Sequence, residues 1–311
     1  MEGSVRKNED DLPQTITFEA ILPAAMAARA EEGGIRRAAM DPLTVFVLSV
    51  MAGAFISFGA IFATTVSAGN ILIAANVSST ASAVLPYGVM RLLAGLVFSL
   101  GLIMVVVGGA ELFTGNNMIV MAWASRKVTT GALLKNWYLA FAGNALGTLC
   151  TAVLMFASMQ YTFGNGSVGL AALNTANSKA ALPFVPALAL GLMCNTLVCL
   201  AVWMCYSART TIDRIVTIVP PITAFVASGF EHSIANIYFI PMGLLIKAGA
   251  PSSFWASIGK TPDDFPELTW EGFFSNLIPV TIGNIIGGSF FVAAVYWFVY
   301  LRRRPLGRNT A

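Results

Sequence analysis

The sequence predicts an all-α membrane protein with six transmembrane helices in two inverted three-helix repeats, of which the second and fifth helices are broken. Three observations support this fold class. Of the 311 residues, 57% are hydrophobic and only 11% are charged, whereas an ordinary soluble domain carries about 25% charged residues. Several apolar stretches exceed the roughly 20 residues that a helix needs to cross a bilayer. Two of these stretches are interrupted by polar residues in matching sequence contexts.

The apolar stretches give the order of the expected spans. Together they form a channel domain over residues 43–301, and the individual spans cover roughly 43–68, 84–124, 134–160, 183–206, 215–247 and 274–301. The second and fifth stretches are too long for one straight crossing of about 30 Å of hydrocarbon. We therefore expect each of them to consist of two helical pieces.

Basic side chains indicate how the spans are oriented. With both termini in the cytoplasm, fourteen of the 18 Lys and Arg residues fall on the cytoplasmic side. The outer side keeps only four of them, Arg91, Lys179, Lys247 and Lys260. Because Lys and Arg concentrate in cytoplasmic loops, residues 1–42 are expected to be a cytoplasmic N-terminal segment and residues 302–311 a basic cytoplasmic tail. The net charge of +3 thus reflects topology and gives no reason to expect a nucleic-acid partner.

The N-terminal segment contains a stretch with helical character at residues 21–39. Its apolar side chains are interspersed with Arg and Glu, and they include Ile21, Met26 and Ile35. This pattern predicts an amphipathic helix on the cytoplasmic face, which Gly33 and Gly34 are expected to end or kink. Two roles remain open: a lid or membrane-surface anchor, or a segment that occludes a pore or docks a cytoplasmic partner.

The two halves of the chain resemble each other. Polar residues interrupt the second span at 110–116 (AELFTGN) and the fifth span at 229–236 (GFEHSIAN). The span after each interruption carries a Gly-Asn-x-x-Gly pattern, at 143–147 and at 283–287. Because each repeat has three spans, the second copy must cross the bilayer in the opposite direction.

Paired helix breaks have a functional consequence. Irregular backbone at membrane depth is tolerated only where it is buried in protein or lines a cavity. In transporters with inverted repeats, broken helices place half-helix ends near the bilayer midplane, where substrates bind. Helix N-termini there favour anions through their free N–H groups and partial positive charge. The sequence therefore predicts a midplane pathway for a small anion.

The single histidine, His232, is the strongest candidate for a functional side chain. It follows Glu231 at the second helix break, at a position that we take as the repeat equivalent of Thr114. Ionisable groups within membrane spans are costly and commonly functional. An unperturbed imidazole titrates near pH 6.5, so its charge can change in the physiological range.

Other polar residues are expected to support this pathway. Thr114 and Asn195 can hold His232 in one orientation or contact the anion, or simply form hydrogen bonds between helices. Structural bracing of the breaks is favoured over substrate contact for Glu111, Glu231, Asn116, Asn144, Asn236 and Asn284. Lys179, the only cation in the expected outer loop between the third and fourth spans, would concentrate anions if it lies at a pore mouth.

Several classes of function lack the residues that they require. The four cysteines lie in apolar stretches without metal-ligand spacing, at Cys150, Cys194, Cys199 and Cys205, and we interpret them as small buried side chains. No glycine-rich nucleotide loop, Ser/His/Asp set or pair of haem histidines is present. We therefore expect no metal, no cofactor and no enzymatic activity, and favour passive or proton-linked permeation.

These motifs resemble the formate/nitrite transporter family. The resemblance rests on ELFTGN at 111–116, KNW at 135–137, GFEHSIAN at 229–236 and LIPVTIGNIIGG at 277–288, and it extends over nearly all of residues 20–303. It is greatest to the bacterial formate channels of the family. The resemblance implies an aquaporin-like protomer in a homopentamer of the bacterial inner membrane, with one pore per protomer for formate and related small monovalent anions.

The resemblance also implies roles for individual residues. Phe98 and Phe225 would form an outer constriction, and an inner slit would consist of Leu102, Leu112, Phe113 and Val198. Thr114, His232 and Asn195 match the central polar site, and Lys179 matches a vestibule lysine. At the slit, His232 would either stay positive and neutralise the anion or pass it a proton so that the neutral acid crosses; both versions predict pH-dependent transport.

Three alternatives remain at this stage. A nitrite or hydrosulfide channel would share the same motifs. An aquaporin would share the inverted broken helices, but its Asn-Pro-Ala boxes are absent from the sequence. A structural or partner-docking membrane protein would conduct no anion at all.

Overall fold

A computed structural model describes residues 19–76 and 85–303, and this part of the chain is built from helices and their connections. The elements in chain order are α1 (Pro23–Ala39), α2 (Pro42–Asn76), α3 (Tyr87–Gly108), α4 (Phe113–Asn116), η2 (Asn117–Ile119), α5 (Val120–Ala124), α6 (Thr130–Ala157), η3 (Gln160–Thr162), α7 (Ser167–Ala180), α8 (Phe184–Cys205), α9 (Thr211–Ala227), α10 (Ser233–Gly249), α11 (Ser252–Ile258), η4 (Pro262–Asp264), α12 (Trp270–Ile286), the π-helix η5 (Gly287–Ala294) and α13 (Val295–Tyr300). Most of the expected basic tail and the first 18 residues of the N-terminal segment lie outside the described residues.

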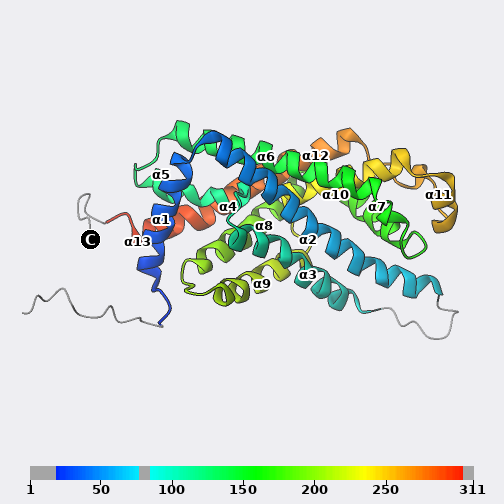
Figure 1. Cartoon of the computed structure of the whole chain (residues 1–311), viewed down its shortest axis with the longest axis horizontal. Helices are drawn as coiled ribbons and strands as arrows, with labels where there is room; N and C mark the ends of the chain where they lie inside the picture. Colours follow the sequence, from blue (N-terminus) through cyan, green and yellow to red (C-terminus); the bar gives the residue numbers. More distant parts are fainter. Residues whose placement is uncertain (1–18, 77–84, 304–311) are drawn as a thin grey trace, which may run out of the picture.

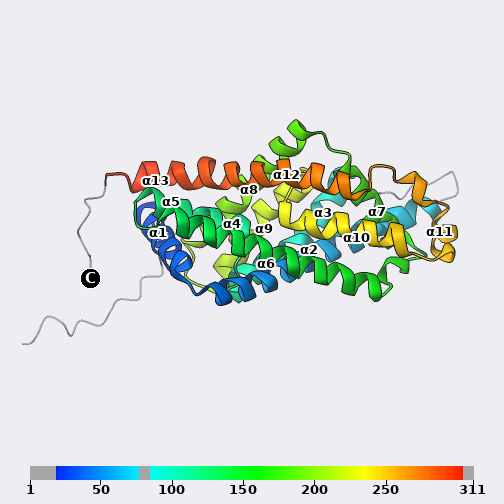
Figure 2. The same ribbon diagram turned by 90° about the horizontal axis from the view of Figure 1, so that it is seen from above.

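The long helices run side by side along the long axis of the molecule. Figures 1 and 2 show α2 and α6 running along much of it, with α1, α5 and α13 at one end and α7 and α11 at the other. We call the end with α1 and α13 the inner end, and the opposite end the outer end. The α2 helix packs against α3 and α6, and α8 packs against α9 and α12 in the same way. The two halves meet where α3 packs against α9 and α6 packs against α10.

The expected spans are present, and two of them are broken. Within residues 19–76 and 85–303, five helical stretches are long and apolar enough to cross a membrane: Pro42–Gly69, Tyr87–Gly108, Thr130–Ala157, Phe184–Cys205 and Trp270–Tyr300. The expected second span is α3 followed by the short helices α4, η2 and α5, and the expected fifth span is α9 followed by α10. The prediction of a helical membrane protein with broken second and fifth spans is confirmed.

The backbone has the same conformation at both breaks. Gly109 and Gly229 each have a φ of 75°, a left-handed conformation that glycine adopts without steric cost and that commonly ends helices. The N–H of the residue after each glycine then donates to a carbonyl five residues earlier: Ala110 donates to Val105 at 2.9 Å, and Phe230 donates to Phe225 at 3.0 Å. The chain therefore leaves α3 and α9 with the same geometry.

The hydrogen bonds after the two breaks fix how the repeats align. The Glu111 N–H donates to the Leu48 carbonyl, and the Glu231 N–H donates to the Leu190 carbonyl, both at 3.3 Å. Glu111 is thus equivalent to Glu231, and the next residue pair is Leu112 and His232. The expectation that His232 is the repeat equivalent of Thr114 is wrong by two positions, because that alignment did not start from the shared glutamate.

The Gly-Asn-x-x-Gly patterns allow two backbones to touch. A Cβ added to Gly147 would lie 2.0 Å from the Val50 carbonyl oxygen, and one added to Gly287 would lie 2.1 Å from that of Leu192. Real Cβ contacts are never this short, so only glycine fits at either place. This close approach of α6 to α2, and of η5 to α8, holds each Asn of the pattern at the break beside it.

The N-terminal helix forms as expected but does not end at its glycines. Helix α1 continues through Gly33 and Gly34 to Ala39. A Cβ at Gly34 would lie 3.0 Å from the Ala122 Cβ and 3.3 Å from the Ile119 Cα. Gly34 therefore serves close packing of α1 on η2 and α5, and the expected end of the helix at these glycines is wrong.

Candidate functional site

His232 lies buried at the second helix break, where it caps α10. Its Nδ1 atom accepts the Ala235 N–H at 3.1 Å, and its Nε2 atom lies 3.1 Å from the Thr114 hydroxyl oxygen. His232 is 3% exposed and Thr114 is fully buried. The two broken spans therefore meet through one hydrogen bond between side chains, as the sequence indicated for Thr114.

Asn195 contributes to this site indirectly. Its Nδ2 atom donates to the Thr114 carbonyl at 3.2 Å and to the Asn284 carbonyl at 2.7 Å. No hydrogen bond joins it to the His232 ring among the described residues. Asn195 therefore positions the backbone that carries Thr114 rather than orienting the imidazole.

Two aromatic rings pack beside His232. The Phe98 and Phe225 rings meet edge to face with centroids 5.6 Å apart, and the Phe225 ring stacks on the His232 ring at 6.0 Å. All three residues line a cavity of about 480 Å³ that also contacts Lys179 and Glu231. The Phe98/Phe225 pair and the imidazole thus lie together on the wall of this outer cavity, and the outer constriction formed by the two rings stays a prediction.

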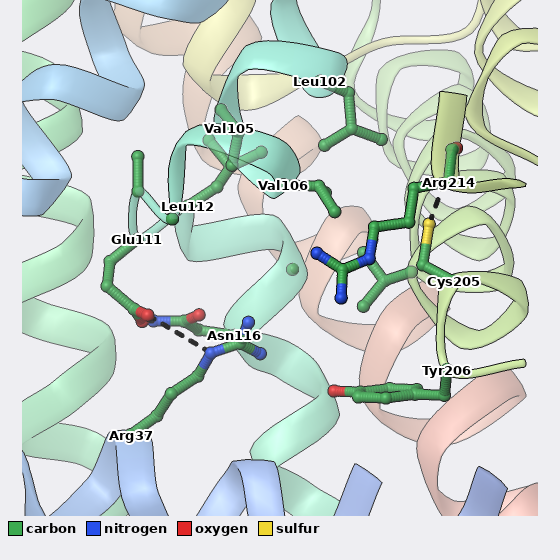
Figure 3. Close-up of a pocket in the computed structure, with 14 residues that line it drawn as sticks. Arg37, Leu102, Val105, Val106, Glu111, Leu112, Asn116, Cys205, Tyr206 and Arg214 are labelled. Carbon is green, nitrogen blue, oxygen red and sulfur yellow. Dashed lines mark hydrogen bonds and ion pairs between the residues drawn. The ribbon is translucent and has the colours of Figure 1, made fainter. Parts of the chain in front are cut away.

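A second cavity lies on the inner side. It measures about 220 Å³, and its lining includes Leu102, Leu112, Glu111 and Arg37. Figure 3 shows Leu102 and Leu112 at its apolar wall, with Arg37 approaching Glu111 from the opposite side. Leu102 and Leu112 therefore line the inner cavity, and their role in an inner slit stays a prediction.

Two other expected slit residues face elsewhere. The Phe113 ring packs edge-on against Trp137 and Phe141, with centroids 6.2 and 5.2 Å away. Val198 is buried at 1% exposure. Neither side chain belongs to the lining of the two cavities, so the structure brings them near the pathway only as packing around it.

A cation and a glutamate meet at each end of the pathway. At the outer end, the Lys179 ammonium lies 2.7 Å from Glu231, and at the inner end the Arg37 guanidinium lies 3.2 Å from Glu111. Lys179 is in the last turn of α7 and Arg37 in the last turn of α1. Helices α1 and α7 thus occupy matching places in the two repeats, each placing one basic side chain on the glutamate of a break.

An asparagine pair supports each of these glutamates. Asn236 donates to Glu231 at 2.6 Å and to Asn276 at 2.7 Å, and Asn276 donates to the Lys179 carbonyl at 2.9 Å. Every polar atom in this chain of contacts except the Asn236 Oδ1 atom has a partner. The glutamate is therefore held by its surroundings and cannot turn toward a passing anion without breaking them.

The inner end repeats this network with other residues. Asn116 donates to Glu111 at 2.8 Å and to Asn136 at 2.9 Å, and Asn136 donates to the Arg37 carbonyl at 3.1 Å. The sequence reasoning missed Asn136 and Asn276. Both precede the asparagine of a Gly-Asn-x-x-Gly pattern by the same spacing, and that repeated spacing would have identified them.

The asparagine of each Gly-Asn-x-x-Gly pattern replaces missing helical hydrogen bonds at a break. Asn284 accepts the Ser233 N–H at 2.9 Å and donates to the Gly191 and Glu231 carbonyls at 2.7 and 2.9 Å. Asn144 accepts the Phe113 N–H at 2.8 Å and donates to the Ser49 and Glu111 carbonyls at 2.7 and 3.0 Å. The expected bracing role of these two residues agrees with these contacts.

Within the described residues, no group of three or more His, Cys, Asp or Glu side chains could hold a metal ion. The arrangement is typical of a membrane channel: two cavities with basic side chains lie at opposite ends of the helix bundle, and one buried polar contact, Thr114–His232, joins the two helix breaks. Carboxylates at both ends are neutralised by cations, which suits the passage of an anion.

Comparison with known proteins gives the family of this pore. The family model "Formate/nitrite transporter" matches residues 24–298, so the chain belongs to the formate/nitrite transporter family. It is 46% identical to the formate channel FocA of Escherichia coli K12, over 92% of this chain and 96% of that protein. It is 39% identical to the formate channel FocA of Haemophilus influenzae, over 89% of this chain and 93% of that protein.

Solved structures agree with this assignment. A pentameric formate channel with formate bound superposes with a TM-score of 0.76 at 42% identity, covering 84% of this chain and 98% of that one. An ion channel of the same family superposes with a TM-score of 0.71 at 26% identity, covering 88% of this chain and 98% of that one. The chain is therefore a multi-pass membrane protein with the channel fold of this family.

Proposed function

We propose that this protein is a formate channel that passes formate and related small monovalent anions through one pore in each protomer of a homopentamer. The observation that carries the proposal is the Thr114–His232 hydrogen bond, which joins the two helix breaks beside the Phe98/Phe225 pair. Relatives that are named formate channels cover nearly the whole chain, and a solved relative is a pentamer with formate bound.

Charge makes entry of the anion favourable. Moving a bare carboxylate into hydrocarbon costs of order 20 kcal/mol before relaxation, so the pore must offset most of this cost. Lys179 and Arg37 neutralise the glutamates at the two ends, so these carboxylates do not repel an anion, and the N-terminus of α10 points its partial positive charge at the centre. The apolar constrictions then leave the Thr114–His232 pair as the polar contact at the narrowest part of the path.

The hydrogen bonds of His232 decide which proton it carries. Because Nδ1 accepts the Ala235 N–H, the proton of the neutral ring is on Nε2, the atom that faces Thr114. A second proton on Nδ1 would break this cap. The arrangement favours a neutral imidazole that offers Nε2–H to the anion, and it makes protonation of the ring cost the cap of α10. Transport is therefore expected to depend on pH.

Substitution of His232 tests this proposal. Formate flux is measured in liposomes between about pH 5 and pH 8, the range around the unperturbed imidazole pKa, for wild type, His232→Asn and His232→Phe. Asparagine caps helices well but does not titrate, so it separates capping from proton exchange; phenylalanine removes both. We expect His232→Asn to retain flux with a flattened pH profile. An unchanged pH profile in both variants would contradict the role of His232.

The same reconstituted sample tests the alternative substrates. Nitrite and hydrosulfide are offered in competition with formate, because a channel for these anions would share the fold and the motifs. Formate should show the largest flux at equal concentration. A larger flux of nitrite or hydrosulfide than of formate would instead identify the protein as a channel for that anion. The absence of any anion flux would support a structural role.

Orientation and the N-terminal segment complete the proposal. We place both termini in the cytoplasm of a bacterium, with residues 1–42 as a cytoplasmic segment before the channel domain 43–301. The α1 helix is tied to the channel by the Arg37–Glu111 pair and by Lys127 and Glu31 at 2.7 Å. Its surface offers a place for a cytoplasmic partner, while membrane lipid covers the outer face of the spans. We propose no enzymatic activity.

A further inference from the structure

A second basic residue, in both cases an arginine, lies at each end of the pathway, near the start of a broken span. Arg91 is at the start of α3 and lines the outer cavity. Arg214 is at the start of α9 and lines the inner cavity. The inverted repeat therefore brings one basic side chain from each half to the opposite mouths, in addition to Lys179 and Arg37.

The outer arginine is fully engaged in supporting the backbone. Its Nε atom donates to the Ala227 carbonyl at 3.2 Å, and its terminal nitrogen donates to the Val226 carbonyl. These are carbonyls of the last turn of α9, which have no further partner within the helix. Arg91 thus caps α9, and its guanidinium has less capacity left for an anion.

The inner arginine, Arg214, does not cap a helix in this way. Among the described residues, no ion pair or side-chain hydrogen bond involves the Arg214 guanidinium. Asp213, its neighbour in sequence, is engaged with the Arg209 and Thr210 N–H groups at 3.0 and 2.9 Å. Figure 3 shows the Arg214 side chain extending into the inner cavity, on the side opposite Arg37.

The charges of the inner cavity do not cancel. Arg37 is balanced by Glu111 at 3.2 Å, so the positive charge of Arg214 remains uncompensated by any ion pair in the described residues. Apolar side chains form the wall beside it, including Leu102 and Val106. A guanidinium presents five donors in a planar fork that matches a carboxylate. The cavity volume of about 220 Å³ leaves room for such a guest.

We propose that Arg214, across from Arg37, forms a binding subsite for the carboxylate of a small monocarboxylate anion at the inner mouth, which the outer mouth does not match. This inference rests on the proposed passage of formate and adds the residue that captures it on one side. The two mouths then differ in affinity although their scaffolds are repeats of each other. The formate concentration that half-saturates transport is therefore lower at the inner face than at the outer face.

Uptake of radiolabelled formate into inverted and right-side-out membrane vesicles tests the subsite. The concentration at half-maximal rate is measured on each face for wild type, Arg214→Gln and Arg214→Lys. Arg36→Gln is the matched control, because Arg36 is exposed on the same side, pairs with Glu32 and lies outside the cavity. Removing one charge contact at about 4 Å in water changes binding about fivefold.

Arg214→Gln should raise the half-saturating concentration about fivefold on the inner face and leave the outer face and the Arg36→Gln control unchanged. Arg214→Lys should lie between wild type and Arg214→Gln. High ionic strength on the inner side should abolish the difference between the faces of wild type, which tests the proposal even if a variant does not assemble. An equal shift on both faces, or equal wild-type affinities, overturns it. Wild-type vesicles without formate uptake would instead refute the proposed function.

Discussion

Replacing Asn284 by alanine removes the brace of the second helix break. The side chain is fully buried, and its amide satisfies the Ser233 N–H and the Glu231 carbonyl. In helix α10 the Ser233 N–H has no partner within the helix, because the first N–H groups of any helix lack one. Alanine therefore leaves one donor and one acceptor unpaired at membrane depth.

The size of the effect follows from these contacts. Each buried group left unpaired costs about 1–3 kcal/mol, which gives roughly 2–6 kcal/mol for the two groups. The lower limit of about 2 kcal/mol also agrees with a second route: hydrogen bonds between membrane helices contribute about 0.6 kcal/mol each on average, and Asn284 makes three such bonds. At about 2–4 °C per kcal/mol, the apparent Tm of Asn284→Ala should fall by at least about 4 °C.

Thermal unfolding of the detergent-purified protein, followed by tryptophan fluorescence, measures this change. Thr281→Val is the control on the same helix, because the Thr281 hydroxyl is buried without a hydrogen-bond partner among the described residues. Its Tm should stay close to that of wild type. Asn144→Ala should lose as much as Asn284→Ala, since it makes the same three bonds in the other repeat. A Tm of Asn284→Ala equal to that of Thr281→Val would refute the bracing role.

Two further predictions concern packing and charge. Gly287→Ala should prevent assembly, because its Cβ would lie 2.1 Å from the Leu192 carbonyl oxygen. The control Gly131→Ala, at a position with open space around it, should assemble normally. Size-exclusion chromatography compares the two variants, and normal assembly of Gly287→Ala would contradict the close approach of η5 to α8. Lys179→Gln should destabilise the protein, because it leaves the buried Glu231 carboxylate without its cation. Breaking a buried ion pair in this way costs about 3–5 kcal/mol. The double variant Lys179→Gln/Glu231→Gln should recover part of the lost Tm, and the absence of any recovery would argue against the ion pair.

The sequence was sufficient to predict the spans, the two breaks and some of the residues around the breaks, but not Asn136 and Asn276. Apolar length marks a span, and polar residues inside an apolar stretch are costly enough to mark a break. The Thr114–His232 contact was one of the alternatives that the sequence left open for Thr114. These features are local in sequence or repeat between the halves, which is why they could be recognised without coordinates.

Contacts between distant segments could not be predicted in the same way. The Arg37–Glu111 pair joins residues 74 positions apart, and no local pattern indicates that an exposed-looking arginine in an amphipathic helix reaches a helix break. Asn195 was expected to orient His232, to contact the anion or to form hydrogen bonds between helices, and its amide donates to the Thr114 and Asn284 carbonyls. Residue type alone could not decide between these alternatives.

The corrected alignment of the repeats indicates where function departs from scaffold. Asn195 takes the place of Gly53: the amide donates to the Asn284 carbonyl at 2.7 Å, and a Cβ on Gly53 would lie 2.2 Å from the Asn144 carbonyl. His232 likewise takes the place of Leu112.

The glutamates, their cations and the bracing asparagines are the same type in both halves, so they maintain the backbone. The differing positions build a single polar site at the centre. The cost of desolvating an anion is highest at the midplane, so one polar contact there, flanked by apolar constrictions, lowers the barrier where it limits passage. A second histidine at Leu112 would replace part of the inner slit with a binding site. We therefore expect Leu112→His to retain the anion and reduce flux in liposomes, and an increase in flux would contradict this division between scaffold and site.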